Sequence, residues 1–190
     1  MTARMSALDA LAVLHEARAP RDVVVTTMAT ARDWMELGAG ATDLVLVPSA
    51  MSHATSVGLG LALAQPDRRV VVCNGDGSML MNLGSLVTIA ASGATNLAVV
   101  LFDNRVYEVT GAQPVPGHTD FAAMARAAGF PSVFHYERLD EWRAQLPTVI
   151  AAPGPSFVWL DVEPTNKPGP RSPGPAGERA RAFMRALGVA

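Results

Sequence analysis

Hydrophobic positions along the chain follow two patterns, one with helical spacing and one that is apolar at every position. Apolar residues recur at helical spacing from Met5 to Leu14, and this pattern stops near Ala19-Pro20, which predicts an opening amphipathic helix. Short β-branched runs without alternation are typical of strands that are buried on both faces. The segments with this strand pattern are 22–27, 44–47, 69–74 and 96–103.

Segments of helical length separate these strands. Helices are expected at 30–37, 53–64, 79–91, 120–128 and 139–151, with two further strands at 132–135 and 157–162. Fully apolar strands with helices between them indicate a parallel sheet that is covered on both sides. The predicted fold class is therefore α/β, doubly wound, with a mainly parallel sheet and helices on both faces.

The end of the chain has a different composition. Residues 163–177 read EPTNKPGPRSPGPAG, which favours an extended arm, and a short helix is expected at 178–187. We therefore predict one compact domain over residues 1–162, followed by a Pro- and Gly-rich arm and a C-terminal helix over residues 163–190.

Composition narrows the class of partner. The 190 residues are 49% hydrophobic and 17% charged, and 15 basic against 17 acidic residues give a formal charge of -2. Without blocks of like charge, neither nucleic acid nor a membrane surface is indicated as a partner, and the apolar runs are too short to span a bilayer. The single cysteine, Cys73, lies in an apolar run, and the first residues lack the apolar core of a signal peptide. We expect a cytoplasmic protein that binds a small molecule or another protein.

Two strand ends carry residues with candidate chemistry. In open parallel sheets, ligands bind at the carboxyl ends of the strands. The segment Gly75-Asp76-Gly77-Ser78 lies between a strand and a helix, where glycines and free backbone N–H groups favour a phosphate. A carboxylate fits there if a hard cation such as Mg²⁺ lies between it and the phosphate oxygens. Because Asp103-Asn104 follows a neighbouring strand, oxygen ligands from both strands could share one cation.

Each motif alone is equally well explained as an ordinary turn. Together they are more specific, because 25 residues separate Gly75-Asp76-Gly77 from Asp103-Asn104, and this spacing resembles the thiamin diphosphate signature. The text GDGSMLMNLGSL, followed by NLAVVLFDNRVYEVTGAQP, closely resembles the cofactor-binding subunit or domain of phosphonopyruvate and sulfopyruvate decarboxylases. The resemblance also covers TTMATARDW and SAMSHATSVGLGLALAQPDRRVVV, and so spans about Val25 to Pro114.

The resemblance implies thiamin diphosphate and Mg²⁺ as cofactors and assigns roles to matching residues. The side chains of Asp76 and Asn104 and the backbone carbonyl of Val106 would bind the metal. Gly77 and Ser78 would donate backbone N–H groups to the diphosphate. Residues 1–162 would then form the diphosphate-side domain of the cofactor site.

Three further cofactor contacts follow from the same resemblance: Gly75, Thr30 and Tyr107. Thr30 is as well explained as an ordinary helix-start residue. Tyr107 opens a loop, YEVTGAQ, where access of the substrate would be controlled. Glu108 is the only carboxylate of this loop, and a solvated charge is its simpler interpretation. We expect His118 to be a capping or surface residue.

The segment from Ser49 to His53 aligns with the G-S-M-G-H of the family. Met51 would be the apolar residue beneath the cofactor that brings the 4′-amino group to C2, although a Met is otherwise a common core filler. Ser49 would offer its backbone carbonyl to that amino group. His53 could meet the diphosphate or the substrate, or it could be a helix-start residue without chemistry.

Four positions depart from the family pattern. Ser49 and Ser52 replace glycines, so the loop is expected to lose conformational freedom there. Met28 replaces a glycine common in the TTG stretch, which weakens the assignment of Thr30. Asp103 replaces the first asparagine of the pair and adds negative charge, whereas Asn104 keeps the metal-binding position.

Half of the expected site is absent from the chain. Thiamin catalysis needs a carboxylate at N1′ of the aminopyrimidine, so that the 4′-imino form can deprotonate C2, and in the family this glutamate lies on a separate pyrimidine-binding domain. We therefore expect a hetero-oligomer in which a partner subunit supplies the glutamate. The small residues Gly58, Gly60, Ala62 and Ala64 would permit close helix packing at the contact, and the arm from Pro164 to Pro175 could embrace the partner.

The sequence thus predicts the cofactor-binding subunit of a two-component 2-oxoacid decarboxylase that acts on a small anionic substrate such as phosphonopyruvate or sulfopyruvate. Alternatives are a carboligase component similar to acetolactate synthase, or a non-catalytic assembly or regulatory protein that retains the fold. A dinucleotide-binding domain is set aside, because Gly58-Leu59-Gly60 lacks the third glycine and does not directly follow a strand.

Overall fold

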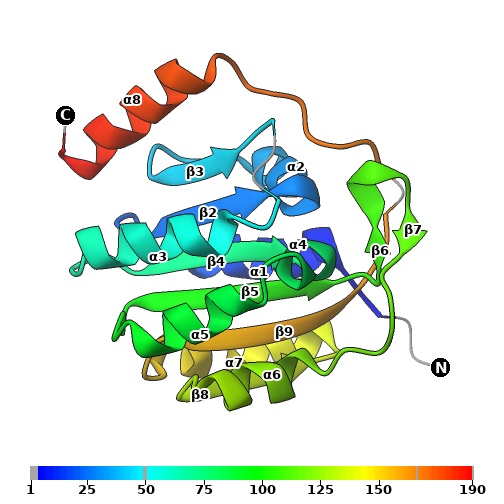
Figure 1. The fold of residues 1–190 in the computed structure, drawn as a ribbon. Helices are drawn as coiled ribbons and strands as arrows, with labels where there is room; N and C mark the ends of the chain where they lie inside the picture. The colour runs from blue at the N-terminus through cyan, green and yellow to red at the C-terminus, as the bar shows by residue number, and fades with distance from the viewer. Residues whose placement is uncertain (1–3, 49–50, 166, 190) are drawn as a thin grey trace.

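A seven-stranded sheet forms the centre of the chain (Figure 1). The structure is a computed structural model that describes residues 4–48, 51–165 and 167–189, so Ser49 lies outside the described residues. Within them every pairing in this sheet is parallel, in the order β1-β9-β5-β4-β2-β3, with β8 also paired to β9. The strands are β1 (Met5–Ser6), β2 (Val23–Thr27), β3 (Asp43–Leu46), β4 (Val70–Gly75), β5 (Leu97–Asp103), β8 (Ser132–Tyr136) and β9 (Ser156–Glu163).

Helices cover both faces of the sheet, as the apolar strands predict. One face carries α1 (Ala7–Ala17), α2 (Met28–Leu37) and α7 (Leu139–Ala151). The other carries α3 (Ala54–Ala64), α5 (Gly84–Ala91) and α6 (Phe121–Ala128) (Figure 1). The expected doubly wound, mainly parallel α/β fold is confirmed. Among the described residues, none of the helices combines the length and apolar character that a membrane crossing requires.

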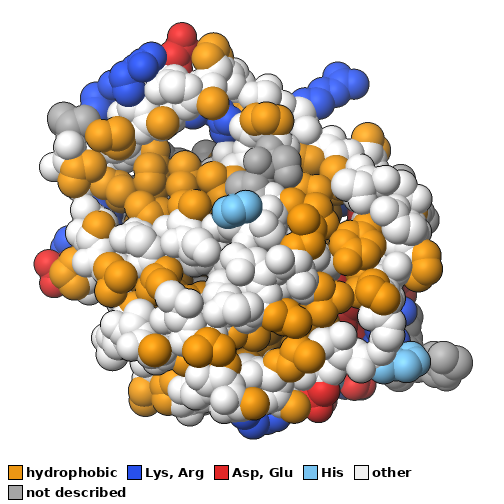
Figure 2. All heavy atoms as spheres, in the orientation of Figure 1, with side chains coloured by type: hydrophobic (Ala, Val, Ile, Leu, Met, Phe, Trp, Pro, Cys, Tyr) orange, Lys and Arg blue, Asp and Glu red, His pale blue; other side chains and the backbone are white. Residues whose placement is uncertain are grey.

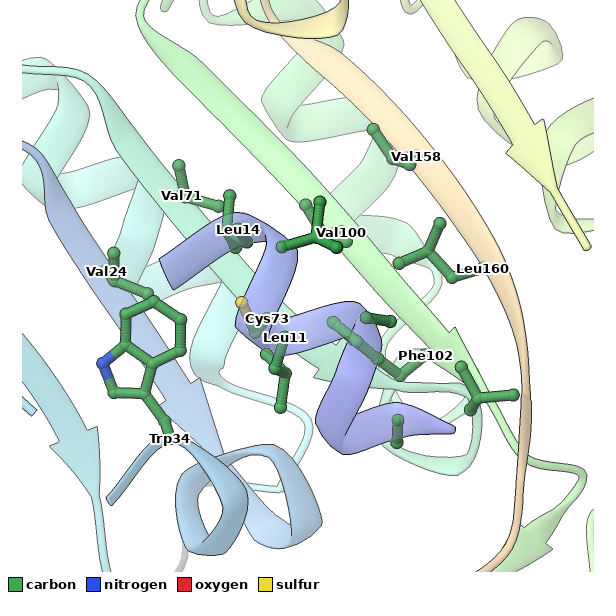
Figure 3. Close-up of a cluster of buried hydrophobic side chains, with 14 of the residues drawn as sticks. Leu11, Leu14, Val24, Trp34, Val71, Cys73, Val100, Phe102, Val158 and Leu160 are labelled. Atoms are coloured by element: carbon green, nitrogen blue, oxygen red, sulfur yellow. The ribbon is translucent and has the colours of Figure 1, made fainter. Parts of the chain in front are cut away.

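The core beneath α1 shows why these segments form these layers. Leu11 and Leu14 of α1 belong to one buried cluster with Val71 and Val100 of the central strands, and Trp34 of α2 lies at the side of this cluster (Figure 3). The Trp34 ring is fully buried, and its indole N–H donates to Asp43 at 2.8 Å. The one polar atom of this large side chain is therefore satisfied.

The single helix expected at 79–91 is wrong, because the segment forms two helices, α4 (Asp76–Leu80) and α5 (Gly84–Ala91). Asn82 lies at the break. The side-chain amide of Asn82 donates to the backbone carbonyl of Ser52 at 3.0 Å. The backbone carbonyl of Asn82 accepts from the Ser85 hydroxyl at 2.8 Å. These side-chain bonds compete with continuous helical hydrogen bonding.

Two features past β5 and β9 complete the fold. An antiparallel hairpin, β6 (Val106–Tyr107) and β7 (Gln113–Pro114), encloses the 3₁₀ turn η1 (Glu108–Thr110). The arm after β9 leads to α8 (Ala176–Leu187), which buries Phe183 and Leu187 against the second core. The division of the chain after residue 162 stays a prediction, and α8 packs on the domain.

Candidate functional site

The carboxyl ends of β2, β4 and β5 meet at one edge of the sheet. β2 and β4 are neighbours in the sheet. The strand that follows β2 in the sequence, β3, lies on the outer side of β2, and the strand that follows β4, β5, lies on the opposite side, so the strand order reverses between β2 and β4. Ligands bind at such switch points in open α/β sheets. A cavity of about 50 Å³ lies here, and residues lining it include Thr30, Met51, Asp76, Gly77, Asn104 and Tyr107.

Asp76 joins the two strand ends that the sequence singled out. Asp76 directly follows β4 and is only 2% exposed. One of its carboxylate oxygens accepts from the backbone N–H of Gly77 at 2.8 Å. The other oxygen accepts from the N–H of Arg105, just past β5, at 2.8 Å. A carboxylate from one turn is thus fixed against the turn of the neighbouring strand.

A second buried carboxyl, Asp103, lies beside Asp76. Asp103 accepts from the N–H of Arg105 at 3.2 Å and from the indole N–H of Trp159 at 3.1 Å. Burial raises the pKa of Asp76 to about 8, and the hydrogen bond and charge of Asp103 act in the same direction. The N–H groups of Gly77 and Arg105 oppose this shift. Two carboxyls held together out of water fit a site that a cation completes.

Asn104 and Val106 follow β5 and line the same cavity as Asp76. The Asn104 side-chain oxygen accepts from the N–H of Val106 at 3.1 Å, and its amide nitrogen donates to Glu108 at 2.7 Å. Asp76, Asn104 and Val106 all line the cavity. Carboxylate, amide and carbonyl oxygens form a donor set that suits a hard cation such as Mg²⁺.

Gly77 and Ser78 each make a close contact at the start of α4. A Cβ atom at position 77 would lie 2.5 Å from Cε1 of Tyr107, so a larger residue there would displace the ring of Tyr107. The hydroxyl oxygen of Ser78 accepts from the N–H of Ser52 at 2.9 Å. This bond fastens the turn before α3 to the start of α4.

Thr30 lines the cavity, but its hydroxyl is engaged within the chain. It lies 2.8 Å from the carbonyl of Thr27 and 2.9 Å from the carbonyl of Cys73, and it accepts from the N–H of Thr27 at 3.2 Å. These contacts support the helix-start interpretation. A role at the diphosphate stays a prediction.

Two described positions where the family has glycine keep a glycine-like backbone. Met28 has φ 54° and Ser52 has φ 73°, which lie in the left-handed region that favours glycine. These two residues therefore adopt a conformation that glycine reaches more easily, at the cost of strain that the surrounding contacts must offset.

Met51 and His53 differ in where the structure places them. Met51 lines the cavity and is half-buried, as a wedge residue would be. His53 is exposed, lies outside the residues that line the cavity, and has its Nδ1 at 2.9 Å from the Ser52 hydroxyl. His118 is also exposed, and Asp120 rather than His118 caps α6. The roles of Met51 and His53 stay predictions.

The expectation of a solvated Glu108 is wrong. Its side chain is 4% exposed and contacts Arg32 at 3.3 Å, the hydroxyl of Thr165, and the amide of Asn104. Sequence reasoning missed Arg32 and Thr165 altogether. No local pattern joins them to Glu108, since they lie 76 and 57 residues away in the chain.

The family to which the chain belongs follows from a match over most of its length. The model of the thiamine pyrophosphate enzymes' C-terminal TPP binding domain matches residues 26–160, a range that includes both strand ends of the site. The chain belongs to this family. Thiamine pyrophosphate is thiamin diphosphate, so the family agrees with the cofactor that the spacing of Gly75-Asp76-Gly77 and Asp103-Asn104 predicted.

Relatives within the family confirm the predicted resemblance to phosphonopyruvate and sulfopyruvate decarboxylases. The chain is 38% identical over 188 residues to phosphonopyruvate decarboxylase of Streptomyces viridochromogenes. This match covers 95% of this chain and 46% of that protein. It is 46% identical over 117 residues to sulfopyruvate decarboxylase subunit beta of Methanothermobacter thermautotrophicus, covering 61% and 60% of the two chains. The chain thus spans about half the length of these relatives.

A solved structure shows the same fold. It is described as that of a thiamin diphosphate-dependent enzyme from Mycobacterium smegmatis, and it matches with a TM-score of 0.75 at 22% identity. The match covers 86% of this chain and 33% of that one. At this identity the likeness concerns the fold alone.

Proposed function

We propose that this chain binds thiamin diphosphate and Mg²⁺ as a component of a 2-oxoacid decarboxylase that acts on a small anionic substrate such as phosphonopyruvate or sulfopyruvate. One observation carries the proposal. The buried carboxyl of Asp76 lies against the turn Asp103-Asn104 of the neighbouring strand, in a chain of the TPP-binding family. The named relatives support the choice of reaction and substrate class.

Mg²⁺ would be held by the side chains of Asp76 and Asn104 and by the backbone carbonyl of Val106. The two adjacent buried carboxyls of Asp76 and Asp103 fit a cation, because they repel each other when both are ionised. Backbone N–H groups of Gly77 and Ser78 would bind the diphosphate, with Gly75, Thr30 and Tyr107 as further cofactor contacts. Thiamin diphosphate, when bound, supplies the carbanion chemistry by which a 2-oxoacid loses CO₂.

The remaining roles of this chain are orientation and exclusion of water. Met51 would support the cofactor from below, and Ser49 would offer a backbone carbonyl to its aminopyrimidine. Tyr107 lies over Gly77 and lines the same cavity, where its ring would cover part of the bound cofactor. His53 would reach the diphosphate or substrate from outside the lining of the cavity.

A partner would complete the site with the glutamate that contacts the aminopyrimidine. The face formed by α3, α4 and α5 fits an interface, because Ala54 to Gln65 and Ser78 to Asn96 hold no charged residue. Figure 2 shows hydrophobic and uncharged side chains over this face, with charged side chains gathered at its borders. Leu63, Met81 and Val87 are 56–59% exposed here. We propose that the pyrimidine-binding part, a second subunit or further polypeptide, covers this face.

The test is turnover with and without the partner. The chain is mixed with its candidate partner, Mg²⁺ and thiamin diphosphate, and CO₂ release is measured from phosphonopyruvate, sulfopyruvate and pyruvate. We expect turnover of an anionic 2-oxoacid that requires both proteins and is lost in Asp76→Ala. Formation of acetolactate from pyruvate would favour the carboligase instead. Absence of turnover with every substrate, despite a stable complex, would favour the non-catalytic alternative.

A further inference from the structure

Glu108 is a buried carboxylate beside the proposed metal site to which the proposed function gives no role. Its side chain is 4% exposed although it lies on the short loop between β6 and β7. One oxygen accepts from the amide nitrogen of Asn104 at 2.7 Å. The other accepts from Arg32 at 3.3 Å and from the hydroxyl of Thr165. Both oxygens are therefore engaged by hydrogen-bond donors.

The contact with Asn104 decides which way its amide points. A carboxylate only accepts hydrogen bonds, so it can contact only the NH₂ end of an asparagine amide. The oxygen of Asn104 is then directed to the other side, where the N–H of Val106 donates to it. We propose that Glu108 is a positioning residue that fixes the Asn104 amide with its oxygen presented to the cation. This inference rests on the proposed function.

Arg32 holds the Glu108 carboxylate in place. Its side chain is 12% exposed and pairs with Asp33 at 2.7 Å as well as with Glu108. A buried carboxylate needs such a partner, because an unpaired charge out of water is costly. Arg32 lies on α2, the helix that follows β2. Its contact with Glu108 therefore connects α2 to the proposed metal-binding turn that follows β5.

The C-terminal arm closes the same network. Arg32 donates to the carbonyls of Lys167 and Pro168 at 3.3 and 3.2 Å and to the hydroxyl of Thr165 at 3.0 Å. The N–H of Thr165 also lies 3.4 Å from Glu108. The arm thereby shields the ion pair from water, and this assigns it a role within this chain as well as any role toward a partner.

The test compares metal affinity in matched variants of the complete chain. Mn²⁺ binding is titrated by electron paramagnetic resonance with saturating thiamin diphosphate, in the presence of the partner chain. We expect Glu108→Ala to weaken Mn²⁺ binding by roughly 10- to 100-fold, the usual loss when a group that orients a metal ligand is removed. Glu108→Gln keeps an acceptor for Asn104 and should recover most of the affinity. Glu178→Gln, exposed on α8, is the control and should match the wild type.

Two further measurements separate positioning from general destabilisation. Thr165→Val removes the hydroxyl of the arm but leaves the Glu108–Asn104 bond. It should speed amide hydrogen exchange at Lys167, whose N–H lies 3.4 Å from the Thr165 hydroxyl, while changing Mn²⁺ affinity far less than Glu108→Ala does. Equal losses in both variants, or no recovery in Glu108→Gln, would overturn the positioning role.

The outcomes also separate this inference from the proposed function. If the wild type binds Mn²⁺ with thiamin diphosphate and Glu108→Ala binds equally well, the inference fails while the proposed function stands. If the wild-type complex binds neither metal nor cofactor, the proposed function itself fails.

Discussion

Burial and the binding of a cation have opposite effects on the ionisation of the Asp76 carboxyl. The carboxyl is buried beside Asp103, so in the metal-free chain its neutral form is favoured and its pKa rises from 3.8 to about 8. A metal ligand must be ionised, so binding of Mg²⁺ would release the proton that Asp76 holds near neutral pH. Burial beside Asp103 therefore disfavours an ionised Asp76 in the metal-free chain, and the proposed cation would remove this penalty.

This shift predicts how stability depends on pH. Between pH 4 and pH 8 the folded, metal-free chain holds a proton that the unfolded chain releases, so its free energy of unfolding should fall as pH rises. The slope reaches at most about 1.4 kcal/mol per pH unit. Urea unfolding in a chelator at several pH values measures it. Asp76→Asn should flatten the curve, and the same slope in both proteins would contradict the account.

Ser52 offers a second residue-level prediction. Its φ of 73° strains a side-chain-bearing residue, so Ser52→Gly should raise the free energy of unfolding by about 1 kcal/mol, the usual cost of a left-handed conformation. Ser56→Gly is the matched control, because Ser56 is exposed within α3 and glycine there should lower stability by about 0.5 kcal/mol. Thermal unfolding measures both. A loss of stability in Ser52→Gly would show that its side-chain contacts outweigh the strain.

The two glycines of α3 do different things, although the sequence suggested one role for both. A Cβ at Gly58 would overlap Cγ2 of Val72, so this glycine lets α3 pack on its own sheet. Nothing lies within 4 Å of a Cβ at Gly60, which is exposed. Of these two glycines, only Gly60 has open space for the contact with the proposed partner.

This difference predicts opposite effects of the same substitution. Gly58→Ala should lower the free energy of unfolding by about 1–3 kcal/mol through overpacking. Gly60→Ala should raise it by up to about 1 kcal/mol, because alanine favours the helix. Chemical denaturation of the two variants measures the contrast. If Gly60→Ala also weakens the complex with the partner, α3 lies in the interface; stabilisation by Gly58→Ala would contradict the packing.

Elements whose pattern is local could be predicted from the sequence, and those set by distant contacts could not. The apolar strands and the segment Gly75-Asp76-Gly77 could be predicted, because their signals, runs of apolar residues and closely spaced glycines, lie in adjacent residues. The break between α4 and α5 depends on Asn82 reaching Ser52, 30 residues earlier. The burial of Glu108 likewise depends on Arg32 and Thr165, which no spacing rule connects.

At the scale of the whole molecule, α8 belongs to the packing of the domain. Arg179 donates to the carbonyl of Val45 at 2.7 Å and to that of Val47, which ties α8 to the end of β3. Phe183 and Leu187 are buried in the second core. The arm thus leads back to the sheet, where α8 lies beside β3, the strand at one border of the sheet (Figure 1).

Neighbouring residues of α8 provide the corresponding prediction. Phe183 is 8% exposed, so Phe183→Ala should lower the free energy of unfolding by about 3 kcal/mol. Met184 is 43% exposed, and Met184→Ala should change it by no more than about 0.5 kcal/mol. Urea denaturation followed by circular dichroism measures both. Equal small effects would mean that α8 detaches from the domain in solution.

The central claim is that Asp76 and the turn after β5 hold thiamin diphosphate through a divalent metal, and calorimetric titration of the cofactor tests it most directly. Thiamin diphosphate is titrated into the chain with its partner, in Mg²⁺ and then in a chelator. We expect binding that requires Mg²⁺, is lost in Asp76→Ala and is kept in Asp67→Ala, whose side chain is exposed far from the cavity. Binding that is indifferent to Mg²⁺ and to Asp76→Ala, or no binding at all, would contradict the claim.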